Sequence, residues 1–140
     1  IVPPAVSLAL TGSMPFGFVL IGLGSMAWVA GFDVLYATAD FKIDREQGLH
    51  SIPAKFGIPA ALVASRGLHV VAVTLLAFAG IVFGAGALYF AGVAAAAILL
   101  TYEQSLVSAS GLSKLNMAFF TMNGVIALVF GTFVVIGEVI

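Results

Sequence analysis

Long apolar stretches separated by short polar or glycine-rich segments make up most of this chain. Charged residues are absent from three of these stretches, 1–32, 67–102 and 115–137. A helix of about 20 apolar residues is long enough to cross the hydrocarbon core of a bilayer. The pattern predicts four membrane-spanning helices, over about 15–40, 54–83, 87–109 and 115–137.

Helices are expected because a helix satisfies its own backbone hydrogen bonds inside lipid. No ten-residue segment alternates polar and apolar residues as a transmembrane β-strand does. Residues 1–10 are apolar but too short to cross a bilayer, and the chain begins with Ile1. We therefore expect an all-α transmembrane bundle with four complete spans and the end of another. Residues 1–140 would form the C-terminal part of a single transmembrane domain in a longer protein.

Composition supports a membrane protein over a soluble one. Hydrophobic residues make up 62% of the chain, charged residues 8%, and the mean hydropathy is +1.22. Soluble domains carry about 25% charged residues, which cover their outer surface. The net charge of −1 argues against a nucleic-acid partner. The absence of cysteine excludes disulfides, zinc–thiolate sites and cysteine nucleophiles from this chain.

The basic residues predict an orientation in the membrane. All five lysines and arginines lie within 42–66 or at Lys114, and the connections at 11–14 and 84–86 carry none. Lysine and arginine favour the cytoplasmic side of a membrane. We therefore expect a multi-pass protein of the cell (inner) membrane, with the 41–53 loop and the Ser113–Lys114 turn in the cytoplasm.

Acidic residues gather where the first predicted span ends. If that helix continued, Asp33, Tyr36, Asp40 and Asp44 would share one face. Asp40 and Asp44 would then lie one turn apart, where two carboxylates repel each other. Mg²⁺ would suit the pair, because it uses one or two carboxylates together with water and substrate phosphates.

A second interpretation of the pair has equal weight on spacing alone. Asp40 and Asp44 could simply end a helix in water, beside Lys42, Arg45 or solvent. Asp33 favours the functional interpretation, because an ionisable side chain deeper in the membrane costs about 2.5–3.5 kcal/mol. Such residues usually face a cavity and take part in function.

Two longer patterns extend this acidic segment and resemble a known family. They are Asp33-x-x-Tyr36-Ala37-x-x-Asp40-x-x-x-Asp44 and Gly48-Leu49-x-Ser51-Ile52-Pro53-x-x-Phe56-Gly57. Together they resemble the second aspartate-rich motif of the UbiA family of intramembrane prenyltransferases, in its 4-hydroxybenzoate polyprenyltransferase branch. The run from Asn116 to Gly124 resembles the last helix of that family. The resemblance implies a larger helical bundle around a central cavity, of which this chain would form the C-terminal half.

The resemblance also implies a reaction and a set of site residues. A polyprenyl group would pass from polyprenyl diphosphate to 4-hydroxybenzoate or a related aromatic acid, in a Mg²⁺-dependent step of quinone biosynthesis. Asp40 and Asp44 would hold the metal and act catalytically with Asp33. The residues expected to contact diphosphate are Arg45, Lys42, Lys55 and Tyr36. The first aspartate motif of the family is absent from this sequence, so we expect these residues to need the N-terminal helices and to be inactive alone.

Alternatives stay open at this point. The basic residues could simply be those that lysine and arginine usually contribute on the cytoplasmic side of a membrane. Tyr36 could equally well be an aromatic anchor at the membrane–water interface. A membrane ion-binding or transport module, an inert scaffold fragment, or another superfamily member (a haem O, chlorophyll or archaeal lipid prenyltransferase) would also fit the pattern.

The remaining polar residues suggest structural contributions. Ser51 is expected to cap a helix that starts near Ile52 and Pro53. We expect His50 in a surface loop and His69 within the packing. We expect Asn116 and Asn123 to form hydrogen bonds across helices. Glu103 and Glu138 lie near the ends of predicted spans, and we expect their side chains to reach water.

Overall fold

The computed structural model describes residues 2–107, 111, 115 and 121–139, and this part of the chain contains seven α-helices. Their bounds are α1 Val2–Thr11, α2 Phe16–Tyr36, α3 Phe41–Glu46, α4 Ile52–Phe56, α5 Ile58–Phe83, α6 Ala87–Ser105 and α7 Asn123–Val139. The predicted all-α class is confirmed. Three helices, α2, α5 and α6, are long and apolar enough to cross a membrane, and α1 and α7 are shorter apolar helices.

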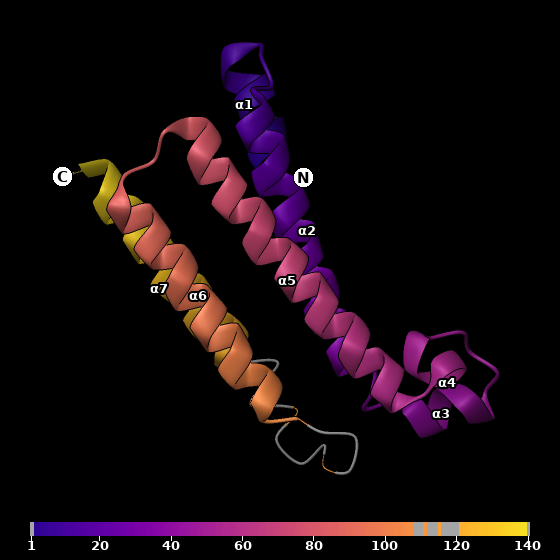
Figure 1. The fold of residues 1–140 in the computed structure, drawn as a ribbon. Helices are drawn as coiled ribbons and strands as arrows, with labels where there is room; N and C mark the ends of the chain where they lie inside the picture. The colour runs from indigo at the N-terminus through magenta and orange to yellow at the C-terminus, as the bar shows by residue number, and fades with distance from the viewer. Residues whose placement is uncertain (1, 108–110, 112–114, 116–120, 140) are drawn as a thin grey trace.

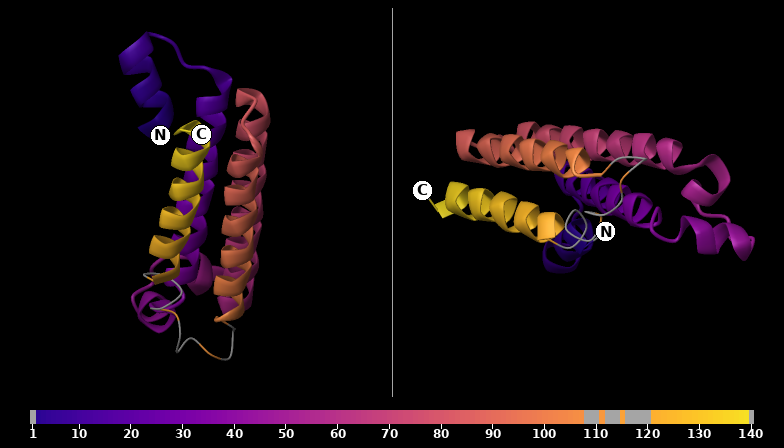
Figure 2. Two further views of the ribbon diagram at one scale, coloured as in Figure 1. Left: turned by 90° about the vertical axis from the view of Figure 1, so that its left-hand side faces the viewer. Right: turned by 90° about the horizontal axis from the view of Figure 1, so that it is seen from below.

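The long helices form two antiparallel pairs that lie side by side. Helix α2 packs along α5, and α6 packs along α7 (Figures 1 and 2). Helices α5 and α6 are joined by a short turn at Gly84, whose φ of +65° falls in the left-handed region that favours glycine. The short helices α3 and α4 lie together beyond one end of the α2–α5 pair (Figure 1).

A buried core ties the two pairs into one bundle. Phe32 on α2 packs with Leu100 on α6 and with Ile126 on α7. A second cluster joins Leu35 on α2 and Leu62 on α5 to Val107, just after α6, and to Leu115. Val107 and Leu115 therefore pack near the end of α2 that leads into α3 and α4. Large apolar side chains elsewhere on α5 and α6 are exposed, as expected for helices that face lipid.

Small residues bring the helices close together. A Cβ atom at Gly80 on α5 would come 2.5 Å from the Tyr89 ring on α6, whose hydroxyl donates to the Leu76 carbonyl at 2.8 Å. A Cβ at Gly92 on α6 would lie 2.7 Å from the Cβ of Phe133 on α7. Close backbone approach at small residues is a common basis of helix packing in membranes, where burial of apolar surface gives little driving force.

Helix α2 is shorter than the first membrane span that the sequence predicts, over about 15–40. It ends at Tyr36 instead of continuing through Asp44, because residues 37–40 form turns before α3 begins. Thr38 is buried, and its hydroxyl donates to the carbonyl of Leu35 at 2.6 Å. The Leu35 carbonyl also accepts from the Thr38 amide at 3.2 Å, so Thr38 donates to it twice. The fourth predicted span lies partly outside the described residues.

Candidate functional site

The acidic segment forms a bend between two helices. Asp33 lies in the last turn of α2, Asp40 immediately precedes α3, and Asp44 lies inside α3. The amide of Asp44 donates to the carbonyl of Asp40 at 2.8 Å, so these two residues are one helical turn apart. Because the helix is broken at residues 37–40, Asp33 lies on a different helix from Asp44. The expectation that the acidic residues share one face of an unbroken helix is therefore wrong.

The three acidic side chains are accessible and carry no intramolecular ion pair among the described residues. Asp33 and Asp40 are exposed, and Asp44 is half-buried. In this part of the chain no basic nitrogen lies within 4.0 Å of their oxygens. The ion pairs with Lys42 or Arg45 that one interpretation allowed are therefore not formed here. The carboxylates face solvent or any ligand that approaches this end of the bundle.

The candidate diphosphate-binding residues lie at the same end as the acidic pair. The Arg45 guanidinium lies 5.6 Å from the centre of the Phe41 ring, and Lys55 Nζ lies 5.3 Å from the centre of the Phe56 ring. Contacts of this kind hold a cation over an aromatic face without neutralising its charge. Lys42 is exposed on α3. The segment from Asp40 to the end of α4 thus presents three carboxylates (Asp40, Asp44 and Glu46) and three cations (Lys42, Arg45 and Lys55).

Tyr36 lies in the last turn of α2, between the acidic segment and the core. It is half-buried and packs against the cluster that includes Leu35 and Leu62. Its ring therefore contributes to packing at this end of the bundle. A contact between its hydroxyl and diphosphate stays a prediction.

The residues after α3 have a structural explanation. Gly48 has a φ of +69° and Gly57 a φ of +87°, conformations that favour glycine, and they flank α4 on either side. Ser51 accepts a hydrogen bond from the Ala54 amide at 3.3 Å, with Pro53 in the first turn. The predicted helix cap is confirmed, and His50 is exposed in the preceding loop as expected. These residues fix the path of the chain between the acidic pair and α5.

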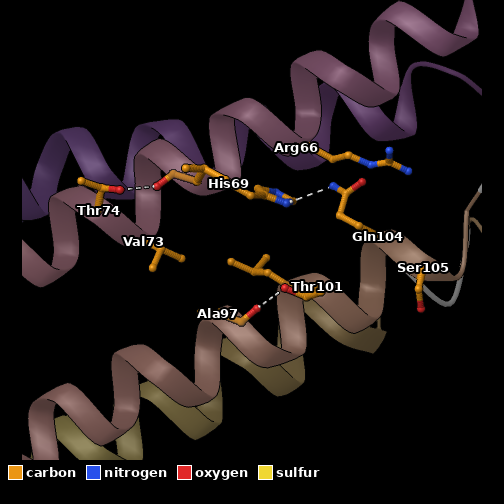
Figure 3. Close-up of a pocket in the computed structure, with 10 residues that line it drawn as sticks. Arg66, His69, Val73, Thr74, Ala97, Thr101, Gln104 and Ser105 are labelled. Carbon is orange, nitrogen blue, oxygen red and sulfur yellow. Dashed lines mark hydrogen bonds between the residues drawn. The ribbon is translucent and has the colours of Figure 1, made fainter.

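A second polar group, which sequence reasoning did not assemble, joins α2, α5 and α6. The Ser65 hydroxyl donates to the carbonyl of Gly31 at 2.8 Å. The Gln104 amide nitrogen lies 2.8 Å from Ser65 Oγ. It also lies 3.1 Å from His69 Nδ1, a contact that Figure 3 shows. His69 is buried, as predicted, and its ring lies so close to α2 that a Cβ at Gly31 would come 2.4 Å from Nε2.

The Ser65 hydroxyl donates its proton to the Gly31 carbonyl, and the Gln104 amide nitrogen donates to Ser65 Oγ. The direction of the contact between Gln104 and His69 Nδ1 depends on which ring nitrogen of the histidine carries the proton.

Glu103 corrects the sequence-based expectation that its side chain reaches water. It is fully buried, and its Oε2 lies 3.7 Å from His69 Nδ1. Glu103 shares a helix face with Leu100 and Ala96, three and seven residues earlier, and both are core residues. That spacing was a signal available in the sequence. Glu138 has no described side chain, Asn116 lies outside the described residues, and Asn123 begins α7.

A cavity of about 450 Å³ opens between α5 and α6, beside this polar group. Val70, Val73 and Leu100 contribute apolar walls, while Arg66 and Gln104 lie together at one end (Figure 3). None of the acidic or basic residues expected to bind metal or diphosphate lines it. Within the described residues no three His, Asp or Glu side chains are arranged to hold a metal ion.

Comparison with known proteins places the chain in a family. The model of the UbiA prenyltransferase family matches residues 1–137. A 4-hydroxybenzoate octaprenyltransferase from Cupriavidus metallidurans is 31% identical over 135 residues, which cover 94% of this chain and 45% of that protein. Enzymes of the same name from Alkalilimnicola ehrlichii and Cronobacter sakazakii are 31% and 29% identical, each over 91% of this chain and 43% of the relative.

The chain thus spans less than half the length of these relatives. No solved structure gives a significant match. The family match extends over nearly every residue, including the acidic bend, helices α1 to α6 and α7 up to residue 137. This chain belongs to the UbiA prenyltransferase family.

Proposed function

We propose that the protein containing this chain transfers a polyprenyl group from polyprenyl diphosphate to 4-hydroxybenzoate or a related aromatic acid. The names of the relatives give 4-hydroxybenzoate as the acceptor and an octaprenyl group as the group transferred, and the sequence resemblance implies diphosphate as its carrier. The observation that carries the proposal is the pair Asp40 and Asp44, one helical turn apart and without intramolecular ion pairs in the described part of the chain. It lies within a segment that the family match covers.

The acidic pair suits a magnesium ion that is shared with a substrate. Asp40 and Asp44 offer carboxylate oxygens, which are the ligands that Mg²⁺ prefers. Among the described residues no three His, Asp or Glu side chains are grouped to hold a metal ion, so phosphate oxygens and water would complete the shell. When bound there, Mg²⁺ would neutralise diphosphate charge and make diphosphate a better leaving group. Asp33, across the bend, would contribute negative charge near the same site.

The basic residues of α3 and α4 would bind and orient the diphosphate. Arg45 can donate two parallel hydrogen bonds to phosphate oxygens, whereas Lys42 and Lys55 act as point charges. The aromatic contacts of Arg45 and Lys55 restrict these side chains without consuming their charge. Their fixed positive charge stabilises the negative charge that develops on the departing diphosphate.

The bundle would supply the dry surroundings that the reaction needs. The bond from the prenyl carbon to the diphosphate oxygen breaks, and diphosphate leaves with the electron pair. The aromatic ring then forms a carbon–carbon bond ortho to its phenol oxygen and loses a ring proton. Water would compete for the same allylic cation, so its exclusion protects the product. Apolar helices that face lipid keep bulk water away from the prenyl chain.

Substitution of the acidic pair tests the proposal. In the full-length protein, Asp40→Asn and Asp44→Asn should each lower prenyl transfer by about 100-fold or more, the scale seen when one charge-stabilising group is lost. Glu46→Gln is the matched control, because Glu46 is an exposed acid of the same helix α3. Near-normal transfer by both aspartate variants, with normal insertion into the membrane, would overturn the proposal.

A further inference from the structure

A cation without a partner lies on α5, a helix that is long and apolar enough to cross a membrane. Arg66 is eight residues past the start of α5 at Ile58, or about 12 Å along the helix axis. Its side chain forms no hydrogen bond or ion pair with any described residue. An arginine within a membrane-spanning segment is costly and usually finds a partner group or reaches water. A match for this positive charge must therefore come from outside the described residues.

Arg66 lies at one end of the cavity between α5 and α6. Figure 3 shows it at the same end as Gln104, with Val73 and Ala97 farther along. The cavity volume of about 450 Å³ falls within the usual range for ligand pockets. Val70 in its wall is 66% exposed, so the cavity opens to the outside of the helix pair. The medium at that opening is lipid if α5 and α6 cross the membrane.

The hydroxyl groups that line the cavity are already used. Thr74 and Thr101 each donate at 2.8 Å to the carbonyl four residues earlier on their own helix. Ser105 donates to the Tyr102 carbonyl at 2.5 Å. The cavity thus combines largely apolar walls with the permanent positive charge of Arg66.

We propose that this cavity binds an anionic phospholipid of the membrane, with its phosphate at Arg66 and one acyl chain along Val73 and Leu100. Arginine donates paired hydrogen bonds to phosphate oxygens, and basic pockets between membrane helices bind anionic head groups. The predicted orientation places this end of α5 toward the cytoplasmic leaflet, which carries anionic lipids. The residues proposed for prenyl transfer do not line the cavity, so the site does not depend on that activity.

A phospholipid fits the cavity better than other anions do. The single cation of the cavity matches the single negative charge of a phosphodiester. Polyprenyl diphosphate carries more charge, and its proposed site has three cations, on α3 and α4. Free phosphate would leave the apolar walls without a partner. A fatty acid has the same charge and a similar chain, and the experiment separates it from a phospholipid.

Photolabelling of the full-length protein in phosphatidylcholine nanodiscs tests the location. The probe is a small amount of phosphatidylglycerol with a photoactivatable group in one acyl chain, and labelled peptides are located by mass spectrometry. Label should fall within 66–74 and 97–105, the segments of α5 and α6 that line the cavity. Label found only elsewhere would overturn the proposal, including the case in which other helices of the full-length protein cover this face.

Competing lipids test the head group without any mutation, on the full-length protein in detergent. Unlabelled phosphatidylglycerol should displace the probe about fivefold better than phosphatidylcholine, because one basic residue contributes about 1 kcal/mol of attraction to anionic lipid. Equal displacement by phosphatidylcholine would overturn the anionic head group. Equal or better displacement by oleic acid would overturn the phosphodiester, and better displacement by polyprenyl diphosphate would assign the cavity to that substrate instead.

Variants separate the charge from the walls. Arg66→Gln should abolish the fivefold preference, whereas Arg66→Lys should keep most of it, because lysine keeps the charge. Ala97→Phe should fill the cavity and abolish labelling, whereas Ala91→Phe, an exposed position of α6 outside the cavity, should leave labelling unchanged. A preference that survives Arg66→Gln, or equal labelling of the two phenylalanine variants, would overturn the proposal. None of these measurements needs prenyl transfer, so failure here is distinct from failure of the proposed function.

Discussion

Glu103 Oε2 lies 3.7 Å from Nδ1 of His69, and both side chains are buried between α5 and α6. This distance is too long for a hydrogen bond, and the nearer partner of Nδ1 is the Gln104 amide nitrogen at 3.1 Å. Both oxygens of Glu103 are buried and lack hydrogen-bond partners within the described residues. This neighbourhood suits a neutral side chain better than a charged one, because a buried charge without a partner is costly.

Glu103→Gln should therefore be tolerated. We expect the midpoint of thermal unfolding of the full-length protein in detergent to stay unchanged or rise. Glu103→Ala should lower stability by about 2 kcal/mol or more, since it leaves a cavity between α5 and α6. If Glu103→Gln lost as much stability as Glu103→Ala, the charge of Glu103 would be needed for stability.

Gly31→Ala should disturb the same polar group from the α2 side. A Cβ there would come 2.3 Å from Cδ2 of His69, so the ring must move, at an expected cost of about 1–3 kcal/mol. Gly67→Ala is the matched control, because Gly67 lies inside α5 with nothing within 4 Å of its added Cβ. Unfolding midpoints check both variants. In the double variant with His69→Ala, Gly31→Ala should cost little, and an undiminished cost would rule out the contact.

Arg45→Gln should weaken binding of polyprenyl diphosphate. Hydrogen bonds to charged groups contribute about 1.5–3 kcal/mol, so we expect KM for this substrate to rise about tenfold or more. Arg45→Lys should recover part of the loss, since it keeps the charge but not the paired donors. Steady-state kinetics of the full-length enzyme measure both. If KM changed no more in Arg45→Gln than in Glu46→Gln, Arg45 would not bind the diphosphate and would contribute only to the orientation of the chain in the membrane.

The absence of cysteine permits a direct test of orientation. His50→Cys, in the exposed loop before α4, should react with a membrane-impermeant maleimide only when the cytoplasmic face is accessible. Gly86→Cys, in the turn between α5 and α6, should react from the opposite face. Any cysteines in the rest of the full-length protein are replaced first. The reverse pattern of labelling would show that the 41–53 loop lies on the side of the membrane opposite to the predicted one.

Several features follow from the sequence alone. Apolar length and the near absence of charge determine a helical membrane protein, because only such helices satisfy their backbone in lipid. Local chemistry also determines the cap at Ser51 and the turns at Gly48 and Gly57. The spacing of Asp40 and Asp44 places them one turn apart, since four residues span about one helical turn.

Other features were decided only by the tertiary structure. Helix α2 ends at Tyr36, and Thr38 beyond it is buried in the packed bundle, which its place in the sequence does not predict. The polar group of Ser65, His69 and Gln104 joins residues 35 to 39 positions apart. The burial of Glu103 and the cavity beside it likewise depend on how α6 is rotated against α5. Periodicity defines a helix and its faces, but the neighbour that each face meets is set by the packing of all the helices together.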